Sequence, residues 1–294
     1  MAIKAGIKKE YLSFSRTFKM WGVLIAVVAL SLIDPALIKV MSSVMNNATQ
    51  IISEDQSADT NVQPTSLEAE AEQGGDSSLA GATGLLGNLS SPETAIYMAT
   101  NDIASTCMLI LMLVMMAAAG GELKKRATII PNCSGLTPGR YLIPKFIFYP
   151  AYIFILSILG ITCSNLICIP LYGKAIDYPL VLLAGVMLGT YMIFMLSVYM
   201  CIGLCTARAG IAVAVVYGGM TIISAIFMGF GAEKFTPFAL TSNIPSVLGG
   251  SIDTVDVLGS IGVSLVLSTI CFFITMMVMT ARQIDNMGEE RGVL

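Results

Sequence analysis

The chain has 294 residues, of which 55% are hydrophobic and only 12% are charged, and its mean hydropathy is +0.80. A water-soluble domain carries about 25% charged residues, so this chain lacks the polar surface that a soluble core of its size requires. We therefore expect an all-α integral membrane protein, in which the net charge of −3 matters less than where the charges lie.

The cysteines do not form the pattern of a disulfide-stapled domain. Six of the seven lie inside apolar runs and one lies in a loop that we place in the cytoplasm, so we expect free thiols. Two are spaced by one helical turn, but the chain has no His and no third thiol nearby, so we expect packing rather than a metal site. The cysteines are Cys107, Cys133, Cys163, Cys168, Cys201, Cys205 and Cys271, and the spaced pair is Cys201 and Cys205.

Residues 1–19 form the first predicted element, an amphipathic elbow helix in the cytoplasmic interface of the membrane. Its apolar residues recur every three or four positions, which places them on one helical face. Its basic residues fall on the other face, where they attract anionic lipid headgroups. A plain basic tail with chance periodicity is the alternative. The apolar set is Ile3, Ile7, Tyr11, Phe14 and Phe18, and the basic set is Lys4, Lys8, Lys9 and Arg16.

Residues 20–45 predict the first membrane span, which we expect to remain as an anchor because no small-residue cleavage site follows its apolar centre. Asp34 lies about 21 Å along this helix, past the midplane toward the outer leaflet. Lys39 lies further outward, where its long side chain can snorkel. An ionised acid at a helix centre costs about 2.5–3.5 kcal/mol. We therefore expect Asp34 either to pair with Lys39 or to line a substrate path.

Residues 46–102 predict an extracytoplasmic loop that is rich in Ser and Gly. Its acidic part, before residue 90, carries seven Asp and Glu and no Lys or Arg, so we expect most of it to be flexible. Ser91 and Pro92 indicate a helix start, and this helix continues as the second span over residues 103–121. One hypothesis is that the loop attracts cationic substrates or acts as a gate. Unchanged transport and selectivity after deletion of residues 53–87 would rule this out.

The rest of the chain predicts four more spans by the same hydropathy criterion. Residues 232–256 predict an extracytoplasmic loop that holds a short re-entrant or interfacial helix. Within the fourth span, Gly185 and Gly189 form a GxxxG pair, which permits close approach of a neighbouring helix. The segments are a cytoplasmic loop at 122–140, spans at 141–169, 178–207, 210–231 and 257–281, and a cytoplasmic tail at 282–294.

The distribution of basic residues sets the orientation. Thirteen of the 16 Lys and Arg residues fall in segments placed in the cytoplasm, and the outer side holds only Lys39, Lys174 and Lys234. The positive-inside rule favours this orientation over its mirror image. We therefore expect a multi-pass protein of a bacterial cell membrane, with both termini in the cytoplasm.

The chain lacks sequence motifs for catalysis. Gly173 and Lys174 do not form a P-loop, because Ala follows them and the upstream Gly is missing. No zinc-protease motif, Ser–Lys arrangement or paired-Asp arrangement stands out. We expect this chain to have no catalytic residues, no bound cofactor or metal, and no nucleic-acid partner.

The most informative segment is the basic bend between the second and third spans. Its three consecutive basic residues favour the anionic inner leaflet or acidic residues of a partner, and its apolar residues offer anchors for docking. Basic residues that only satisfy the positive-inside rule are the alternative. The segment reads Glu122, Leu123, Lys124, Lys125, Arg126, Ala127, Thr128, Ile129 and Ile130, followed by Leu136, Thr137, Pro138, Gly139, Arg140, Tyr141, Leu142 and Lys145.

This segment and the layout around it resemble the membrane subunits of ABC-2 type ATP-binding cassette transporters. In that family the second span ends in a Glu and a basic stretch; a coupling helix, a Thr-Pro turn and a Lys that opens the third span follow. The elbow helix, the large outer loop after the first span and the six spans match the family's layout. The sequence departs from the family at Ala127, where Gly is usual, and at Pro131, which interrupts the coupling region.

The resemblance implies the permease subunit of an ATP-driven exporter, which pairs with a second, identical or homologous, permease. A separate cytoplasmic ATP-binding cassette ATPase would bind ATP and Mg. Two other interpretations stay open: a non-transporting scaffold, sensor or immunity subunit, and a cation channel or ion-coupled carrier that uses Asp34. The residues that the resemblance assigns to the ATPase contact are Glu122, Leu123, Lys124, Lys125, Arg126, Thr128 and Ile129.

Overall fold

The computed structural model contains helices and no strands in the part of the chain that it describes, which is residues 2–58, 91–116, 118–119, 138–230, 234–251 and 254–291. Six helical segments are long and apolar enough to cross a membrane, which confirms the predicted helical class and number of spans. These segments are Lys19–Val44, Pro92–Val114, Gly139–Tyr172, Tyr178–Thr206, Ala209–Phe227 and Thr254–Ala281.

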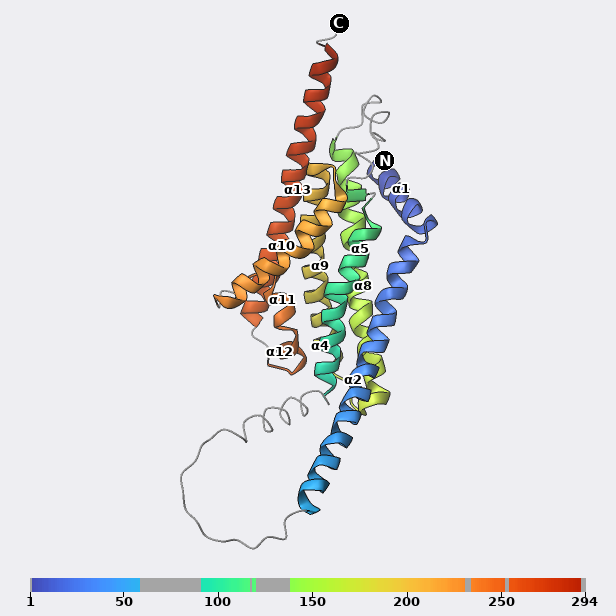
Figure 1. Ribbon diagram of the computed structural model, residues 1–294. Coiled ribbons are helices and arrows are strands. Elements are labelled where there is room, and N and C mark those ends of the chain that lie inside the picture. The colour runs from blue at the N-terminus through green and yellow to red at the C-terminus, as the bar shows by residue number, and fades with distance from the viewer. Residues whose placement is uncertain are drawn as a thin grey trace.

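The helices run up and down in turn and form one bundle (Figure 1). The first helix and the end of the last helix lie at the same end of this bundle, as six crossings require. The elements are α1 (Ala2–Arg16), α2 (Lys19–Ala58), α4 (Pro92–Asp102), the π-helix η1 (Ile103–Cys107), α5 (Met108–Val114), α8 (Pro138–Tyr172), α9 (Tyr178–Thr206), α10 (Ala209–Gly229), α11 (Ala239–Ser242), α12 (Ile244–Leu248) and α13 (Thr254–Arg291).

The centre of the bundle is α9. In its most apolar stretch 67% of the residues are buried, compared with 11% for the spans in α10 and α13. α8 and α13 pack directly on it. The weakly buried helices therefore present apolar side chains outward, where a bilayer replaces the protein core as their solvent.

Two helices extend further than the hydropathy predicts. α2 continues to Ala58, although the sequence predicts a loop from residue 46 onward. Residues 46–58 contain no Gly or Pro, so nothing in this polar stretch stops a helix that is already formed. Likewise, α13 continues to Arg291 through most of the predicted tail.

Local signals set several helix ends. The Ser91 side chain accepts a hydrogen bond from the backbone N–H of Thr94 at 3.3 Å, and Pro92 is the first helical residue, which confirms the predicted start of this helix. At the opposite end of the bundle, Ala207 caps the C-terminus of α9. Its backbone adopts the left-handed conformation, with a φ of 54°. The chain then turns at Arg208 into α10, between the predicted spans 178–207 and 210–231.

The N-terminal helix α1 docks on α8 through aromatic rings. Phe14 is buried, and its ring centre lies 5.4 Å from that of Tyr152 and 5.6 Å from that of Tyr149. The hydroxyl group of Tyr149 donates a hydrogen bond to Glu10 at 2.9 Å, within the buried face of α1. The predicted basic side chains are exposed; they are Lys4, Lys8, Lys9 and Arg16. Of the predicted apolar face, Phe14 is buried, whereas Tyr11 and Phe18 are exposed.

We expect Phe14→Ala to release α1 from α8. Truncation of a buried Phe costs about 3–5 kcal/mol, and every 1.4 kcal/mol changes an opening equilibrium about tenfold. Hydrogen–deuterium exchange of the α1 amides in lipid nanodiscs should accelerate by about tenfold or more. Phe18→Ala is the matched control, because the Phe18 side chain is 79% exposed. Equal exchange in the two variants would contradict docking through Phe14.

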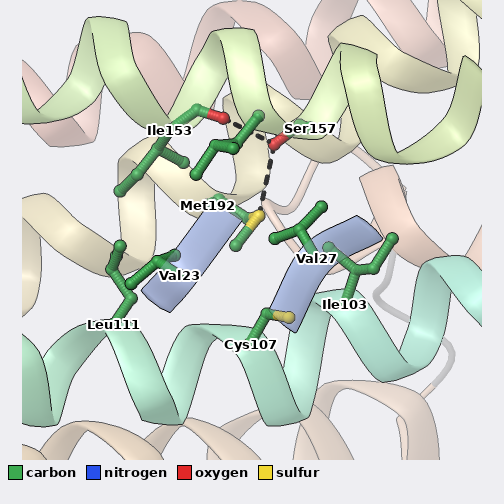
Figure 2. A pocket seen from close by; sticks show the side chains of 9 residues that line it. Val23, Val27, Ile103, Cys107, Leu111, Ile153, Ser157 and Met192 are labelled. Carbon is green, nitrogen blue, oxygen red and sulfur yellow. Dashed lines mark hydrogen bonds between the residues drawn. The ribbon is translucent and has the colours of Figure 1, made fainter. Parts of the chain in front are cut away.

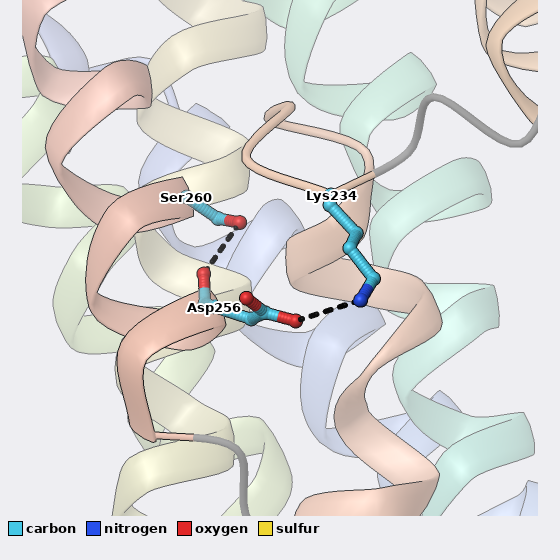
Figure 3. A network of polar contacts seen from close by, with 3 residues as sticks. All are labelled: Lys234, Asp256 and Ser260. Atoms are coloured by element: carbon cyan, nitrogen blue, oxygen red, sulfur yellow. Dashed lines mark hydrogen bonds and ion pairs between the residues drawn. The ribbon is translucent and has the colours of Figure 1, made fainter.

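The segment between α10 and α13 returns to the bundle as two short helices. α11 packs against α9 and α13, and α12 packs against α9 and α4. Leu240 and Ile244 are fully buried there, so the short helix predicted for this segment is present in two pieces. Figure 3 shows Lys234 reaching Asp256 at the start of α13, with an N–O distance of 3.9 Å.

Candidate functional site

The residues assigned by resemblance to an ATPase contact lie outside the described part of the chain. Glu122, Leu123, Lys124, Lys125, Arg126, Thr128 and Ile129 all belong to this group. Their roles stay predictions. The structure does describe the helix ends from which this basic segment leaves the bundle and to which it returns.

Lys145 joins these two ends. It lies two turns into α8, is fully buried, and donates a hydrogen bond from Nζ to the backbone oxygen of Ala118 at 3.1 Å. Its Nζ also lies 4.5 Å from the centre of the Tyr141 ring, a cation–π arrangement. Ala118 is near the end of the second span, where helix carbonyls lack intrahelical partners and the helix dipole is negative. The ammonium group of Lys145 therefore supplies a donor to an unpaired carbonyl and a positive charge to the negative end of the helix dipole.

The end of the second span also touches the central helix α9. A Cβ atom added to Gly203 would overlap the backbone oxygen of Ala119, so only Gly permits this approach. About one helical turn before Gly203 in α9, the buried Tyr199 hydroxyl donates a hydrogen bond to the backbone oxygen of Met112 at 2.8 Å. α9 is thus attached to the second span at two levels.

The start of α8 is attached to the last helix in the same region. A Cβ atom at Gly139 would lie 2.8 Å from Cε of Met276 in α13. The rings of Phe146 and Phe272 meet edge to face with centres 5.1 Å apart. The described helix ends on either side of the basic segment thus contact α9 at Gly203 and α13 at Gly139.

A small cavity lies deeper in the bundle, between α2, η1, α5, α8 and α9. Its volume is about 10 Å³, close to the minimum that one water molecule needs. Figure 2 shows the Ser157 hydroxyl within hydrogen-bond distance of the Ile153 backbone oxygen (2.9 Å) and of Met192 Sδ (3.3 Å). This cavity is too small for a transported molecule. It is lined by Val23, Val27, Ile103, Cys107, Leu111, Ile153, Leu156, Ser157 and Met192.

The ion pair predicted between Asp34 and Lys39 does not form within the described residues. The ammonium group of Lys39 lies instead over the Tyr172 ring, 4.7 Å from its centre. Asp34 is buried, and its Oδ2 has no hydrogen-bond partner among the described groups. Helix geometry explains the difference, because residues five apart point about 140° away from each other.

The two glycines of the GxxxG pair face α8. A Cβ atom at Gly185 would lie 3.2 Å from the Cα atom of Ile158, and one at Gly189 would lie 2.7 Å from the Phe154 ring. The α8–α9 interface is the most extensive in the bundle. The backbone of α9 therefore approaches α8 closely on this face.

A third thiol does lie beside the cysteine pair, contrary to expectation. The side chains of Cys271 and Thr275 in α13 lie beside Cys201 in α9, close enough to interact with its thiol. Within the described ranges, no group of three or more His, Cys, Asp or Glu has the arrangement of a metal site. A whole span, Ala209–Phe227, lies between Cys271 and the pair in the sequence, so only the packing of α13 on α9 reveals this neighbour.

Sequence reasoning also missed Glu10 and Asp102. Glu10 interrupts the apolar face of α1 four residues before Phe14, which is the one signal that could have identified it. Asp102 was placed in the outer loop, whereas it belongs to the membrane-spanning segment Pro92–Val114.

Comparisons with known proteins do not assign the chain to a family. No protein family, curated protein or solved structure matches the chain. The sequence and fold define a helical, multi-pass membrane protein.

Proposed function

We propose that this chain is the permease subunit of an ABC-2-like, ATP-driven exporter. Two six-span units pair, each contributes half of the transmembrane path, and each contacts a separate cytoplasmic ATPase that binds ATP and Mg. The observation that carries the proposal is the basic segment between the second and third spans, whose two ends are joined by the buried Lys145.

The proposed mechanism uses the attachments at the cytoplasmic end. ATP binding closes the ATPase pair and displaces residues 122–137 on both permeases. Because Lys145 holds Ala118 and Gly203 lies against Ala119, a displacement that reaches these two alanines is passed on to α9. Packed helix interfaces switch between discrete arrangements rather than deforming continuously, so a movement at this end changes the opening of the path.

The test is co-purification of the chain from its native membrane, followed by ATPase measurements in liposomes. We expect an ATP-binding cassette ATPase in roughly equal amount. Glu122→Ala and Arg126→Ala should each lower ATP hydrolysis by the complex by about tenfold, equivalent to ~1.4 kcal/mol. Lys174→Ala is the matched control, because Lys174 is exposed in the connection between the third and fourth spans.

Two outcomes would overturn the proposal. Native membranes that yield the chain without any ATPase would support a scaffold, sensor or immunity subunit instead. Full activity in both variants would show that the basic residues serve orientation in the membrane only.

A further inference from the structure

Helix α2 carries a proline inside its membrane-spanning part. Pro35 lies within the segment Lys19–Val44 and has no backbone N–H, so the carbonyl group of Ser31, one turn earlier, lacks its usual donor. The proline ring also crowds that carbonyl group, which weakens the helix at this point. Within a bilayer, a carbonyl group that loses its donor in this way must find another donor in the protein.

Ser164 of α8 supplies the missing donor. Its hydroxyl oxygen lies 3.1 Å from the backbone oxygen of Ser31 and 3.2 Å from that of Gly160 in its own helix. The Gly160 carbonyl group can accept from the backbone N–H of Ser164, whereas Pro35 offers the Ser31 carbonyl group nothing. The one hydroxyl proton is therefore needed at Ser31, where it ties α2 to α8 beside the proline.

One face of α8 follows α2 through this region. Its members are spaced by four residues, so they stack on the same side of the helix. At one end of the face, a Cβ atom at Gly160 would lie 3.0 Å from Val27 of α2. At the other end, the Tyr172 hydroxyl donates to the backbone oxygen of Pro35 at 3.4 Å. The four residues of this face are Gly160, Ser164, Cys168 and Tyr172.

The two halves of α2 differ in how firmly they are held. Before Pro35, the side chains of Val23 and Val27 are each only 1% exposed. Within residues 36–44, Ser42 is the one buried residue, and its hydroxyl donates to the Lys39 backbone oxygen of the same helix at 3.0 Å. A cation–π arrangement joins Lys39 to the Tyr172 ring of α8. The half beyond Pro35 thus has little packing that resists movement.

Asp34, the residue before the proline, favours such a movement. Its side chain is 8% exposed, and its Oδ2 is sealed from solvent without a hydrogen-bond partner among the described groups. A polar oxygen in this position has lost its hydration and gained no hydrogen bond in return, whether the carboxyl group is ionised or neutral. A form of α2 that admits water to Asp34 would restore that hydration.

We propose that α2 hinges at Pro35 between a closed form, which the Ser164 hydrogen bond stabilises, and an open form, which hydration of Asp34 stabilises. The conformation described above is the closed form. In the open form, the half of α2 beyond Pro35 tilts away from α8, and water reaches Asp34 and the adjoining face of α8. Packed helices switch between discrete arrangements, so these are two separate states. The hinge does not depend on the proposed permease function.

Two native thiols report the opening in the unmutated chain. Cys168 lies on the face of α8 that follows α2 and is 0% exposed, and Cys107 lines the small cavity beside Val23 and Val27 and is 1% exposed. Maleimides react with thiolates, which form where water reaches the sulfur. For the full chain in lipid nanodiscs, we expect N-ethylmaleimide to modify Cys168 faster than Cys107, as read by mass spectrometry of each cysteine peptide. Equal rates for these two equally buried thiols would overturn the hinge.

Ser164→Ala removes the bond that stabilises the closed form. We expect it to accelerate modification of Cys168 by about tenfold and to leave Cys107 unchanged. Ser197→Ala is the matched control, because Ser197 is also buried but its hydroxyl donates within its own helix, to the Ile193 backbone oxygen at 2.8 Å. If the control accelerates Cys168 as much as Ser164→Ala does, or if Cys107 accelerates together with Cys168, the change is a general loosening and the proposal fails.

Pro35→Ala makes the test specific to the proline. Alanine restores a backbone N–H for the Ser31 carbonyl group, so Ser164→Ala should have no effect on Cys168 in this background. An equal effect of Ser164→Ala with and without the proline would contradict the assigned role of Ser164.

Asp34→Leu tests the force that favours opening. Leucine has a similar volume but gains nothing from water, so the closed form should dominate and modification of Cys168 should slow. An unchanged or faster rate would remove Asp34 from the hinge. These measurements involve no ATPase, so their failure leaves the proposed permease function standing.

Discussion

Lys145→Met is expected to lower the free energy of unfolding by about 3 kcal/mol. Methionine has a similar length and keeps the side-chain volume, but it cannot donate a hydrogen bond to the Ala118 carbonyl. That oxygen then stays buried at the negative end of a helix without the ammonium group that it contacts at 3.1 Å. SDS titration in mixed micelles, followed by circular dichroism, measures the change.

The matched control for this prediction is Arg140→Met. Arg140 lies on the same helix, carries the same charge and is exposed, so its removal should change stability by less than about 0.5 kcal/mol. If both variants unfold alike, Lys145 does not join the two helix ends. In the proposed permease, Lys145→Met should also uncouple ATP hydrolysis from transport, so that less is transported per ATP hydrolysed. Arg140→Met should leave this ratio unchanged.

Hydropathy and charge determine what could be predicted from the sequence. The six spans were identified because uncharged apolar runs of about 20 residues are typical of transmembrane helices and rare in soluble domains. The start at Ser91 was identified because a capping Ser before Pro is a local signal. The extension of α2 to Ala58 was missed, because polar composition was given more weight than the absence of Gly and Pro.

Contacts between distant residues could not be predicted in this way. Tyr149 and Glu10 are 139 positions apart, and Tyr199 and Met112 are 87 positions apart. The rotation of each helix about its axis decides which side chains meet, and a uniformly apolar helix gives no periodic signal for that rotation. For α9, which is apolar all round, the glycines were the one usable indication of which face packs closely.

The second large effect is expected from Gly203→Ala, which should destabilise the protein by about 2–3 kcal/mol. The added methyl group would overlap the backbone oxygen of Ala119, and a main-chain atom cannot rotate away as a flexible side chain can. α9 would have to move away from the end of the second span. Because α9 is the central helix, that shift would also disturb its contacts with α8 and α13.

Gly218→Ala separates this steric effect from the general effect of a helical glycine. A Cβ atom at Gly218 in α10 would meet no atom within 4 Å. Because Gly in a helix costs roughly 0.5–1 kcal/mol relative to Ala, the control should be neutral or slightly more stable. Opposite signs for the two substitutions in the same SDS titration would support the contact at Ala119. A stabilising Gly203→Ala would mean that α9 and the second span are not in contact there, and the proposed transmission from the basic segment to α9 would lose its physical basis.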